Sequence, residues 1–156
     1  MKETELVFEA IRVGDYEQLK RLFIATPALV NTRDTRGFTP LIFASYFGNL
    51  ETSQLLLECH ADVDAKDHSG NTALIGVCFK GNEVLIKLLL KNGANINMQN
   101  NLGTTALIFA AMYNKENSIR ILLDHGADIA ITDNSGNTAL DYAVQKDFMS
   151  IAGLLR

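Results

Sequence analysis

Short apolar stretches recur along the chain in pairs, and polar, glycine-containing segments separate one pair from the next. The first stretch of a pair is four residues long and occurs at 41–44, 74–77 and 107–110. The second ends in three consecutive aliphatic residues, at 55–57, 88–90 and 121–123. A tight turn containing Gly48, Gly81 or Asn114 lies between the two stretches. This arrangement predicts pairs of short helices, each helix with one apolar side.

An eight-residue phrase precedes each of the later helix pairs and returns every 33 residues. It runs Asp or Asn, two variable residues, Gly, one variable residue, Thr, Pro or Ala, and Leu, and its glycines are Gly37, Gly70, Gly103 and Gly136. The side chain of the Asp or Asn can form hydrogen bonds with nearby backbone groups, and glycine readily adopts a positive φ. The first half of the phrase therefore favours a turn. The threonine suits a helix N-cap, and Pro40 suits the first helical position. A fixed period of this length indicates a solenoid whose units bury apolar surface only against their neighbours.

The period divides one domain of 156 residues into five units. Residues 34–66, 67–99 and 100–132 are internal repeats. Residues 1–33 lack the turn phrase but keep two helical patterns, so we interpret them as an N-terminal capping repeat. Residues 133–156 stop at the end of a second helix and are interpreted as a truncated C-terminal capping repeat. At the helix ends, Gly93 and Gly126 fit the left-handed closing residue, and His60 is expected there with positive φ and some strain.

Two motifs make the chain resemble an ankyrin-repeat protein. Gly37-Phe-Thr-Pro-Leu41 with Ala44 is similar to the family's first motif, and residues 121–128, Ile-Leu-Leu-Asp-His-Gly-Ala-Asp, are similar to its second. The resemblance covers the whole chain as about five repeats and implies an all-α solenoid of stacked helix-turn-helix units with projecting β-turn fingers. The histidine of the family's first motif is absent, so greater apolar packing between first helices is expected to replace its bracing. The residues in its place are Ile42, Ile75, Ile108 and Asp141.

Composition argues against several classes of protein and of partner. A net charge of −4 argues against nucleic acid or an anionic membrane as the main partner. No apolar run approaches the roughly 20 residues that a membrane span needs, and the charged residues 1–5 lack the apolar core of a signal peptide. Cys59 and Cys78 are out of phase with the repeat and form no disulfide framework. We therefore expect a cytoplasmic protein that is a monomer on its own and needs no cofactor.

The side chains that could carry catalysis are few and scattered. His60, His68 and His125 include no pair with the two- or four-residue spacing of a zinc site. His125 and Cys59 hold equivalent positions at helix ends, where a capping role explains them. Asp141 belongs to a capping box. The sequence therefore predicts that the protein is not an enzyme, and a metal- or thiol-dependent enzyme is the alternative that these side chains leave open.

The resemblance implies that partners dock on a concave face made by the fingers and the first helices. The residues that end each first helix are aromatic or methionine at positions that should be solvated, and such side chains are enriched in interface hot spots. Packing of helix on helix is the alternative explanation. With the neighbouring finger residues, the predicted protein-binding face comprises Arg33, Arg36, Phe38, Tyr46, Phe47, Lys66, His68, Phe79, Lys80, Leu102, Met112 and Tyr113.

The predicted function is binding of another protein, as an adaptor or an inhibitor. Arg33, Arg36, Lys66 and Lys80 gather on the N-terminal half of the face, whereas acidic residues belong to the second helices and the loops after them. The partner is therefore expected to offer an apolar segment bordered by acidic residues. An ordinary solvated surface would show the same charges. A stable regulatory subunit of an enzyme encoded elsewhere is the alternative function.

Overall fold

The computed structural model describes residues 2–156, which contain ten α-helices, one 3-10 helix and no β-strand. The first helices of the five units are α1 (Glu3–Val13), α3 (Pro40–Tyr46), α5 (Ala73–Lys80), α7 (Ala106–Met112) and α9 (Ala139–Gln145). The second helices are α2 (Tyr16–Ala25), α4 (Leu50–Glu58), α6 (Glu83–Lys91), α8 (Glu116–Asp124) and α10 (Met149–Leu154), and the 3-10 helix η1 (Pro27–Asn31) follows α2. The predicted all-α class is confirmed.

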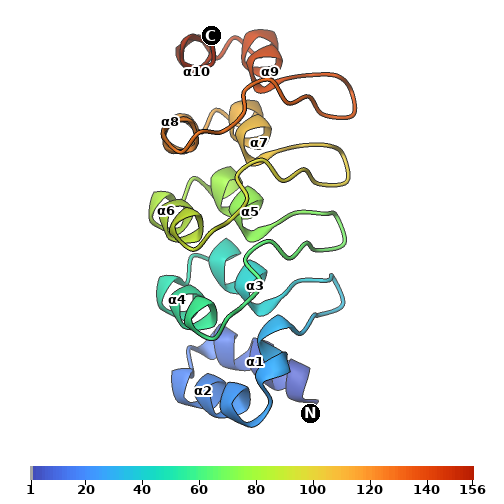
Figure 1. Cartoon of the computed structure of the whole chain (residues 1–156), viewed down its shortest axis with the longest axis vertical. Helices are drawn as coiled ribbons and strands as arrows, with labels where there is room; N and C mark the ends of the chain where they lie inside the picture. The colour runs from blue at the N-terminus through green and yellow to red at the C-terminus, as the bar shows by residue number, and fades with distance from the viewer. Residues whose placement is uncertain (1) are drawn as a thin grey trace.

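The helix pairs stack along the long axis of the molecule, with the two termini at opposite ends (Figure 1). The first helices form the middle layer, and the second helices lie on one side of it. On the other side, the loops between units project as fingers, whose turns are residues 34–37, 67–70, 100–103 and 133–136 (Figure 1). The surface made by the fingers and the ends of the first helices is the predicted concave face, and we keep that name for it.

The first helices begin at the predicted threonines. The hydroxyl oxygens of Thr39, Thr72 and Thr105 accept hydrogen bonds from the backbone amides three residues later, at 3.2, 3.3 and 3.2 Å. At Thr138 the same bond forms, and the Asp141 carboxylate accepts from the Thr138 amide, which completes the predicted capping box. These bonds satisfy amides that a helix start leaves without partners, so they fix where each finger ends and each helix begins.

The acid or amide at the start of each finger shapes its turn. Asp34 Oδ1 accepts from the amides of Arg36 and Phe38 at 2.9 and 3.0 Å, and Gly37 adopts φ +77°. The same pair of bonds recurs at residues 67, 100 and 133. The predicted turn chemistry is therefore confirmed in all four fingers.

Backbone hydrogen bonds join each finger to the next. The amides of His68, Asn101 and Asn134 donate to carbonyl oxygens of the preceding finger at 3.2, 3.0 and 2.9 Å. These contacts leave almost no room above Gly37, Gly70 and Gly103. A Cβ on Gly103 would lie 2.6 Å from Asn134 Oδ1 and 2.8 Å from the Asn134 amide nitrogen. The fingers therefore form a continuous row in which each turn supports the following one.

A second row of bonds runs beside the first, again with a step of 33 residues. Arg33 donates to the Lys66 carbonyl, Lys66 Nζ donates to the Gln99 carbonyl at 2.8 Å, and Gln99 Nε2 donates to the Thr132 carbonyl at 3.1 Å. This row braces neighbouring units in a chain that lacks the signature histidine. The isoleucines that replace it, at 42, 75 and 108, are buried in the core as expected.

The residues that close the helices adopt the backbone conformation that the sequence predicts. Gly93 and Gly126 have φ of +87° and +82°, and His60, in the equivalent place, has φ +66°. Asn114, in the turn between α7 and α8, has φ +55° where the units before it have glycine. His60 and Asn114 are thus positions where an L-residue is held in a sparsely populated conformation.

One polar atom interrupts the core of α4. Thr52 and Ser53 are fully buried at the positions that Leu85 and Ile86 occupy in α6. Ser53 Oγ donates to the Asn49 carbonyl at 2.7 Å. Thr52 Oγ1 is the one buried side-chain oxygen or nitrogen within residues 2–156 that has no hydrogen-bond partner. A buried polar atom without a partner costs desolvation that nothing offsets.

The finger glycines allow a matched test of the turn. In Gly136→Ala the new Cβ meets no atom within 4 Å, so only the positive φ of +81° opposes it, at a cost of about 1–2 kcal/mol. Gly103→Ala adds the collision with Asn134 and should lower the free energy of unfolding by about 1 kcal/mol more. Denaturant unfolding of both variants measures the difference. Equal costs would contradict the close packing of fingers.

The unpaired hydroxyl of Thr52 gives a second test. Thr52→Val keeps the shape of the side chain and removes the unsatisfied oxygen, so the free energy of unfolding should rise by about 1 kcal/mol. Ser53→Ala is the control, because it removes a hydroxyl that is hydrogen-bonded and should bring no such gain. Thermal unfolding followed by circular dichroism distinguishes the two. A lower melting temperature for Thr52→Val would show that the hydroxyl has a partner.

Candidate functional site

The ends of α3, α5 and α7 place aromatic side chains on the concave face. Phe47 and Tyr113 are 61% and 47% exposed, and Tyr46, Phe79 and Met112 are half-buried. On the fingers, Leu102 is 69% exposed. Much of the apolar surface of these side chains is therefore not buried in the core of the fold. Their side chains are available to a partner.

The first of two aromatic clusters lies in the N-terminal half. Phe43 contacts Phe8 edge-on with ring centroids 5.6 Å apart, and Phe47 lies 4.9 Å from Phe43 and 5.4 Å from Tyr46. The guanidinium of Arg12 lies 5.7 Å from the centre of the Phe43 ring. We call Phe8, Phe43, Tyr46 and Phe47 the N-terminal aromatic cluster.

The second cluster lies in the C-terminal half. Phe79 contacts Phe109 and Tyr113 with centroid distances of 5.7 and 4.9 Å, and Phe109 stacks on Tyr113 at 5.6 Å. Lys146 Nζ donates to the Met112 carbonyl at 2.9 Å and lies 5.5 Å from the Tyr113 ring centre. We call Phe79, Phe109 and Tyr113 the C-terminal aromatic cluster.

The aromatic column expected from the sequence is therefore divided in two. No contact between aromatic rings joins the clusters among residues 2–156, and Lys80 Nζ instead lies 4.8 Å from the Tyr46 ring centre. Part of each cluster comes from a helix position that the sequence analysis did not single out. That position holds Phe43 and Phe109, which lie two repeat lengths apart, and this spacing is the signal that would have found it.

Basic side chains lie beside the N-terminal cluster, around a hollow of about 720 Å³. Its lining includes Lys2, Arg12, Arg33 and Arg36, and also the carboxylates of Glu5 and Asp34. Arg36 pairs with Asp34 at 2.7 Å and stacks on Phe38, with 4.2 Å from the guanidinium carbon to the ring centre. Burial raises the pKa of Asp34, but the hydrogen bonds from Arg36 and the backbone outweigh it and hold the pKa below its ordinary value.

Three of the predicted binding residues also have structural roles. Arg33 and Lys66 donate to backbone carbonyls of the next unit, which fixes their charged ends within the row that braces the fingers. The His68 ring lies against Gly37, where an added Cβ would be 2.4 Å from its Cδ2 atom. Among the predicted cations, Arg36 and Lys80 are the ones that lie over aromatic rings of the face.

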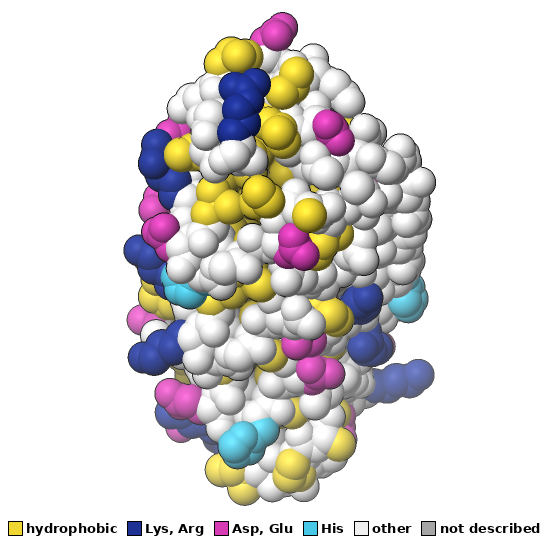
Figure 2. Space-filling view, turned by 45° about the horizontal axis from the view of Figure 1, so that its top comes forward, with side chains coloured by type: hydrophobic (Ala, Val, Ile, Leu, Met, Phe, Trp, Pro, Cys, Tyr) yellow, Lys and Arg dark blue, Asp and Glu magenta, His cyan; other side chains and the backbone are white. Residues whose placement is uncertain are grey.

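The layer of second helices has a different character. Basic and acidic side chains alternate along the edge of the molecule where this layer lies (Figure 2). The charges of α8 pair locally, with Arg120 bonded to Glu116 at 2.7 Å. The outer side is therefore mixed in charge rather than purely acidic.

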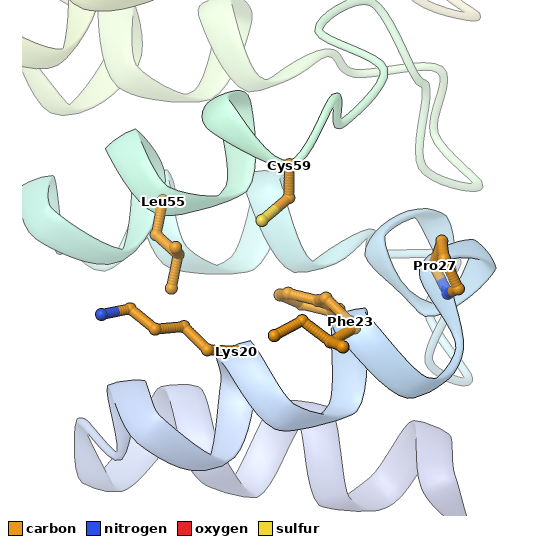
Figure 3. Close-up of a pocket in the computed structure, with 6 residues that line it drawn as sticks. Lys20, Phe23, Pro27, Leu55 and Cys59 are labelled. Atoms are coloured by element: carbon orange, nitrogen blue, oxygen red, sulfur yellow. The ribbon is translucent and has the colours of Figure 1, made fainter.

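An apolar hollow of about 370 Å³ lies between α2 and α4. Figure 3 shows Lys20 and Phe23 on α2 opposite Leu55 and Cys59 on α4. Ile24 also lines the hollow and is 82% exposed. This hollow lies in the layer of second helices. It is a second apolar surface on which a partner could bind, so an experiment must distinguish it from the concave face.

The cysteines and histidines are the side chains on which a metal- or thiol-dependent enzyme would depend. Within the part of the chain that the structure describes, no three His, Cys, Asp or Glu side chains lie close enough to hold a metal ion. Both cysteines are free. Burial raises the pKa of the Cys78 thiol far above its ordinary value, and burial with the nearby Glu58 carboxylate raises that of Cys59. Both side chains are thus kept as thiols, which are poor nucleophiles.

At the C-terminal end, a tyrosine occupies the helix position that holds Phe43 and Phe109 in earlier units. The Tyr142 hydroxyl donates a short hydrogen bond to Asp133 Oδ2 in its own finger. Burial raises the pKa of Asp133, but the bond from Tyr142 and those from the amides of Asn137 and Ser135 outweigh it, so the pKa lies below its ordinary value. The bond to Asp133, and then burial, raises the pKa of Tyr142.

Stacked helix pairs with projecting fingers and an aromatic inner surface define a repeat protein of the solenoid class. A family model described as "Ankyrin repeats (3 copies)" matches residues 7–100 and again residues 75–156. The chain belongs to the ankyrin-repeat family, whose repeats are protein–protein interaction modules. The resemblance drawn from the sequence is confirmed.

Similar proteins include the human "DNA-binding protein RFXANK", which is 53% identical over 49 residues, 31% of this chain and 19% of that protein. The rat "Ankyrin repeat and SAM domain-containing protein 6" is 38% identical over 56 residues, 36% of this chain and 6% of that protein. The matched segments thus span about a fifth or less of the length of these relatives. In residues 2–156, no helix has the length and apolar character needed to cross a membrane.

The bond between Tyr142 and Asp133 can be tested by titration. Tyr142→Phe removes the hydroxyl and should raise the pKa of Asp133, measured by carboxyl-carbon NMR. A carboxylate whose folded pKa is depressed stabilises the fold above its unfolded pKa, and this contribution is lost as pH falls through the folded pKa. The variant should therefore lose less stability in acid than the wild type. Tyr113→Phe is the control, and an equal shift of Asp133 in both variants would contradict the assignment.

Proposed function

We propose that the protein binds a partner protein on its concave face, as an adaptor or an inhibitor. The observation that carries the proposal is the exposure of aromatic side chains on both clusters, with Phe47 and Tyr113 61% and 47% exposed. Aromatic residues are enriched at interfaces because they provide large apolar contact area with little loss of side-chain freedom. Helix packing accounts for Phe43 and Phe109, which are largely covered, and leaves the exposed rings for recognition.

The partner that fits this face is an apolar segment bordered by acidic residues. The hollow beside the N-terminal cluster offers Arg12 and Arg36, and Lys80 lies between the two clusters. Arg33 and Lys66 contribute positive charge, although their side chains also bind backbone carbonyls. Complementary charge at such a border mainly raises the association rate and the specificity.

The two relatives are named for different features. The rat protein is named for its ankyrin repeats and a SAM domain, and the human one is named as DNA-binding. The net charge of −4 on this chain favours a protein partner over DNA. Two free cysteines favour a reducing compartment such as the cytoplasm. A stable regulatory subunit differs from an adaptor in that it would co-elute with its enzyme at fixed stoichiometry in gel filtration.

Two substitutions with matched chemistry test the face. Phe47→Glu and Val84→Glu each replace an exposed apolar residue, 61% and 58% exposed, with an acid. Phe47 lies on the concave face and Val84 lies on α6. Phe47→Glu should weaken capture of the partner by about tenfold or more, since hot-spot truncations cost about 2 kcal/mol, while Val84→Glu should retain it. Quantitative pull-down from the native cell, with melting temperatures of both variants, measures this.

Ile24→Glu extends the test to the hollow between α2 and α4. If this variant or Val84→Glu loses the partner while Phe47→Glu keeps it, the binding surface is in the second-helix layer and the proposal for the concave face is wrong.

A further inference from the structure

One helix position has an aromatic residue in three of the four units with a finger and glycine in the other. The residues at this position, 33 apart, are Phe43, Gly76, Phe109 and Tyr142. The rings of Phe43 and Phe109 lie against residues near the end of the first helix of the unit before. Phe43 lies under Arg12, and Phe109 contacts Phe79. At Gly76 the corresponding neighbour is the Tyr46 ring, and residue 76 contributes no ring of its own.

The backbone does not require glycine at this position. Gly76 is in the interior of α5 and is not among the glycines with positive φ. An added Cβ would meet Tyr46 Cδ2 at 3.4 Å, which is ordinary contact. Glycine is second only to proline as an unfavourable residue in a helix interior. Its effect here is therefore to leave space on the concave face, between the two aromatic clusters.

That space is a cavity of about 260 Å³. Apolar walls come from the unit before, through Phe38, Ile42 and Tyr46, and polar groups come from the finger, through Asp67, Ser69 and Asn71. Small-molecule sites usually measure about 300–1,000 Å³, so this cavity suits one side chain of a partner. The Lys80 ammonium lies 4.8 Å from the centre of the Tyr46 ring, which lines the cavity.

The last unit shows what fills such a space. There, Asp133 Oδ1 holds the amides of Ser135 and Asn137, and Oδ2 accepts the hydroxyl of Tyr142. Asp67 is the equivalent of Asp133, and its Oδ1 holds the amides of Ser69 and Asn71, each at 2.9 Å. Within residues 2–156 its Oδ2 has no hydrogen-bond or salt-bridge partner. The acceptor is thus in place without the ring that donates to it.

We propose that this cavity binds a tyrosine side chain of the partner, whose ring takes the place vacated at Gly76 and whose hydroxyl donates to Asp67 Oδ2. The proposal rests on the concave face being the binding surface and names one residue that the surface recognises. The phenol matches both halves of the cavity, with apolar walls for the ring and a carboxylate for the hydroxyl. A phosphate on that tyrosine would meet the Asp67 carboxylate and prevent entry.

NMR titration of the ¹⁵N-labelled protein with N-acetyl-tyrosinamide tests the site directly. The compound should shift the amides of Ser69, Asn71 and Gly76, with a Kd on the order of millimolar. N-acetyl-phenylalaninamide lacks the hydroxyl and should bind about tenfold more weakly, because hydrogen bonds to a carboxylate are among the stronger ones. N-acetyl-phosphotyrosinamide should not bind. Equal binding of the tyrosine and phenylalanine compounds, or shifts confined to other residues, would overturn the proposal.

Two variants separate the ring from the acceptor. Gly76→Tyr recreates the arrangement of Tyr142, fills the cavity and should abolish binding of both compounds while the melting temperature holds or rises. Asp67→Asn preserves the turn, as Asn100 does in the next finger, but places an amide nitrogen where the carboxylate oxygen was. It should remove the preference for tyrosine over phenylalanine. Retention of that preference in Asp67→Asn would contradict the role of the carboxylate.

A selection of displayed random peptides distinguishes this proposal from the proposed function. Peptides retained by the wild type should carry a tyrosine, and both Gly76→Tyr and Phe47→Glu should lose them. Peptides that need Phe47 but bind Gly76→Tyr unchanged would overturn the tyrosine site and leave the concave face intact. Peptides that depend on neither residue would overturn both.

Discussion

The structure depends on one constraint, that no unit can bury its apolar side except against the unit next to it. Because this contact repeats with a step of 33 residues, other interactions adopt the same step. The fingers bond amide to carbonyl from one turn to the next, and the row of Arg33, Lys66 and Gln99 follows beside them. Such a molecule is stabilised by interfaces between nearest neighbours rather than by one central core.

In a scaffold of this kind the helices and fingers are held in fixed places. When one side chain is missing, the neighbouring units do not move in to fill its space. Threonine caps set where each first helix starts, and the turn sets how each finger projects. When Gly76 omits the ring present at Phe43 and Phe109, the neighbouring units hold their places and a cavity remains. The division of the aromatic surface into two clusters is the visible result. Specificity therefore resides in departures from the repeat, and the repeat itself provides the frame.

The local chemistry of the chain was enough to predict the repeat, the threonine caps, the finger turns and the left-handed His60, because each depends on residues within one turn of chain. Side-chain contacts between units were harder to foresee. Arg33 and Lys66 looked like free cations, yet they bind carbonyls of the next unit, a choice set by three-dimensional geometry. Tyr113 is exposed as expected, whereas Met112 is half-buried. The contacts of Tyr113 with Phe79 and Phe109 became evident only in the structure.

The two aromatic clusters meet at the boundary between residues 34–66 and residues 67–99, where Gly76 leaves its cavity, and this has a geometric consequence for any ligand. In a linear array, the separation of two surface features changes only by whole units, so it behaves as a ruler with fixed graduations. Insertion of one unit at this boundary would move the clusters apart by one graduation while leaving each intact. A bound segment must match that graduation in its own spacing of anchors, and length, as much as chemistry, becomes a criterion of recognition.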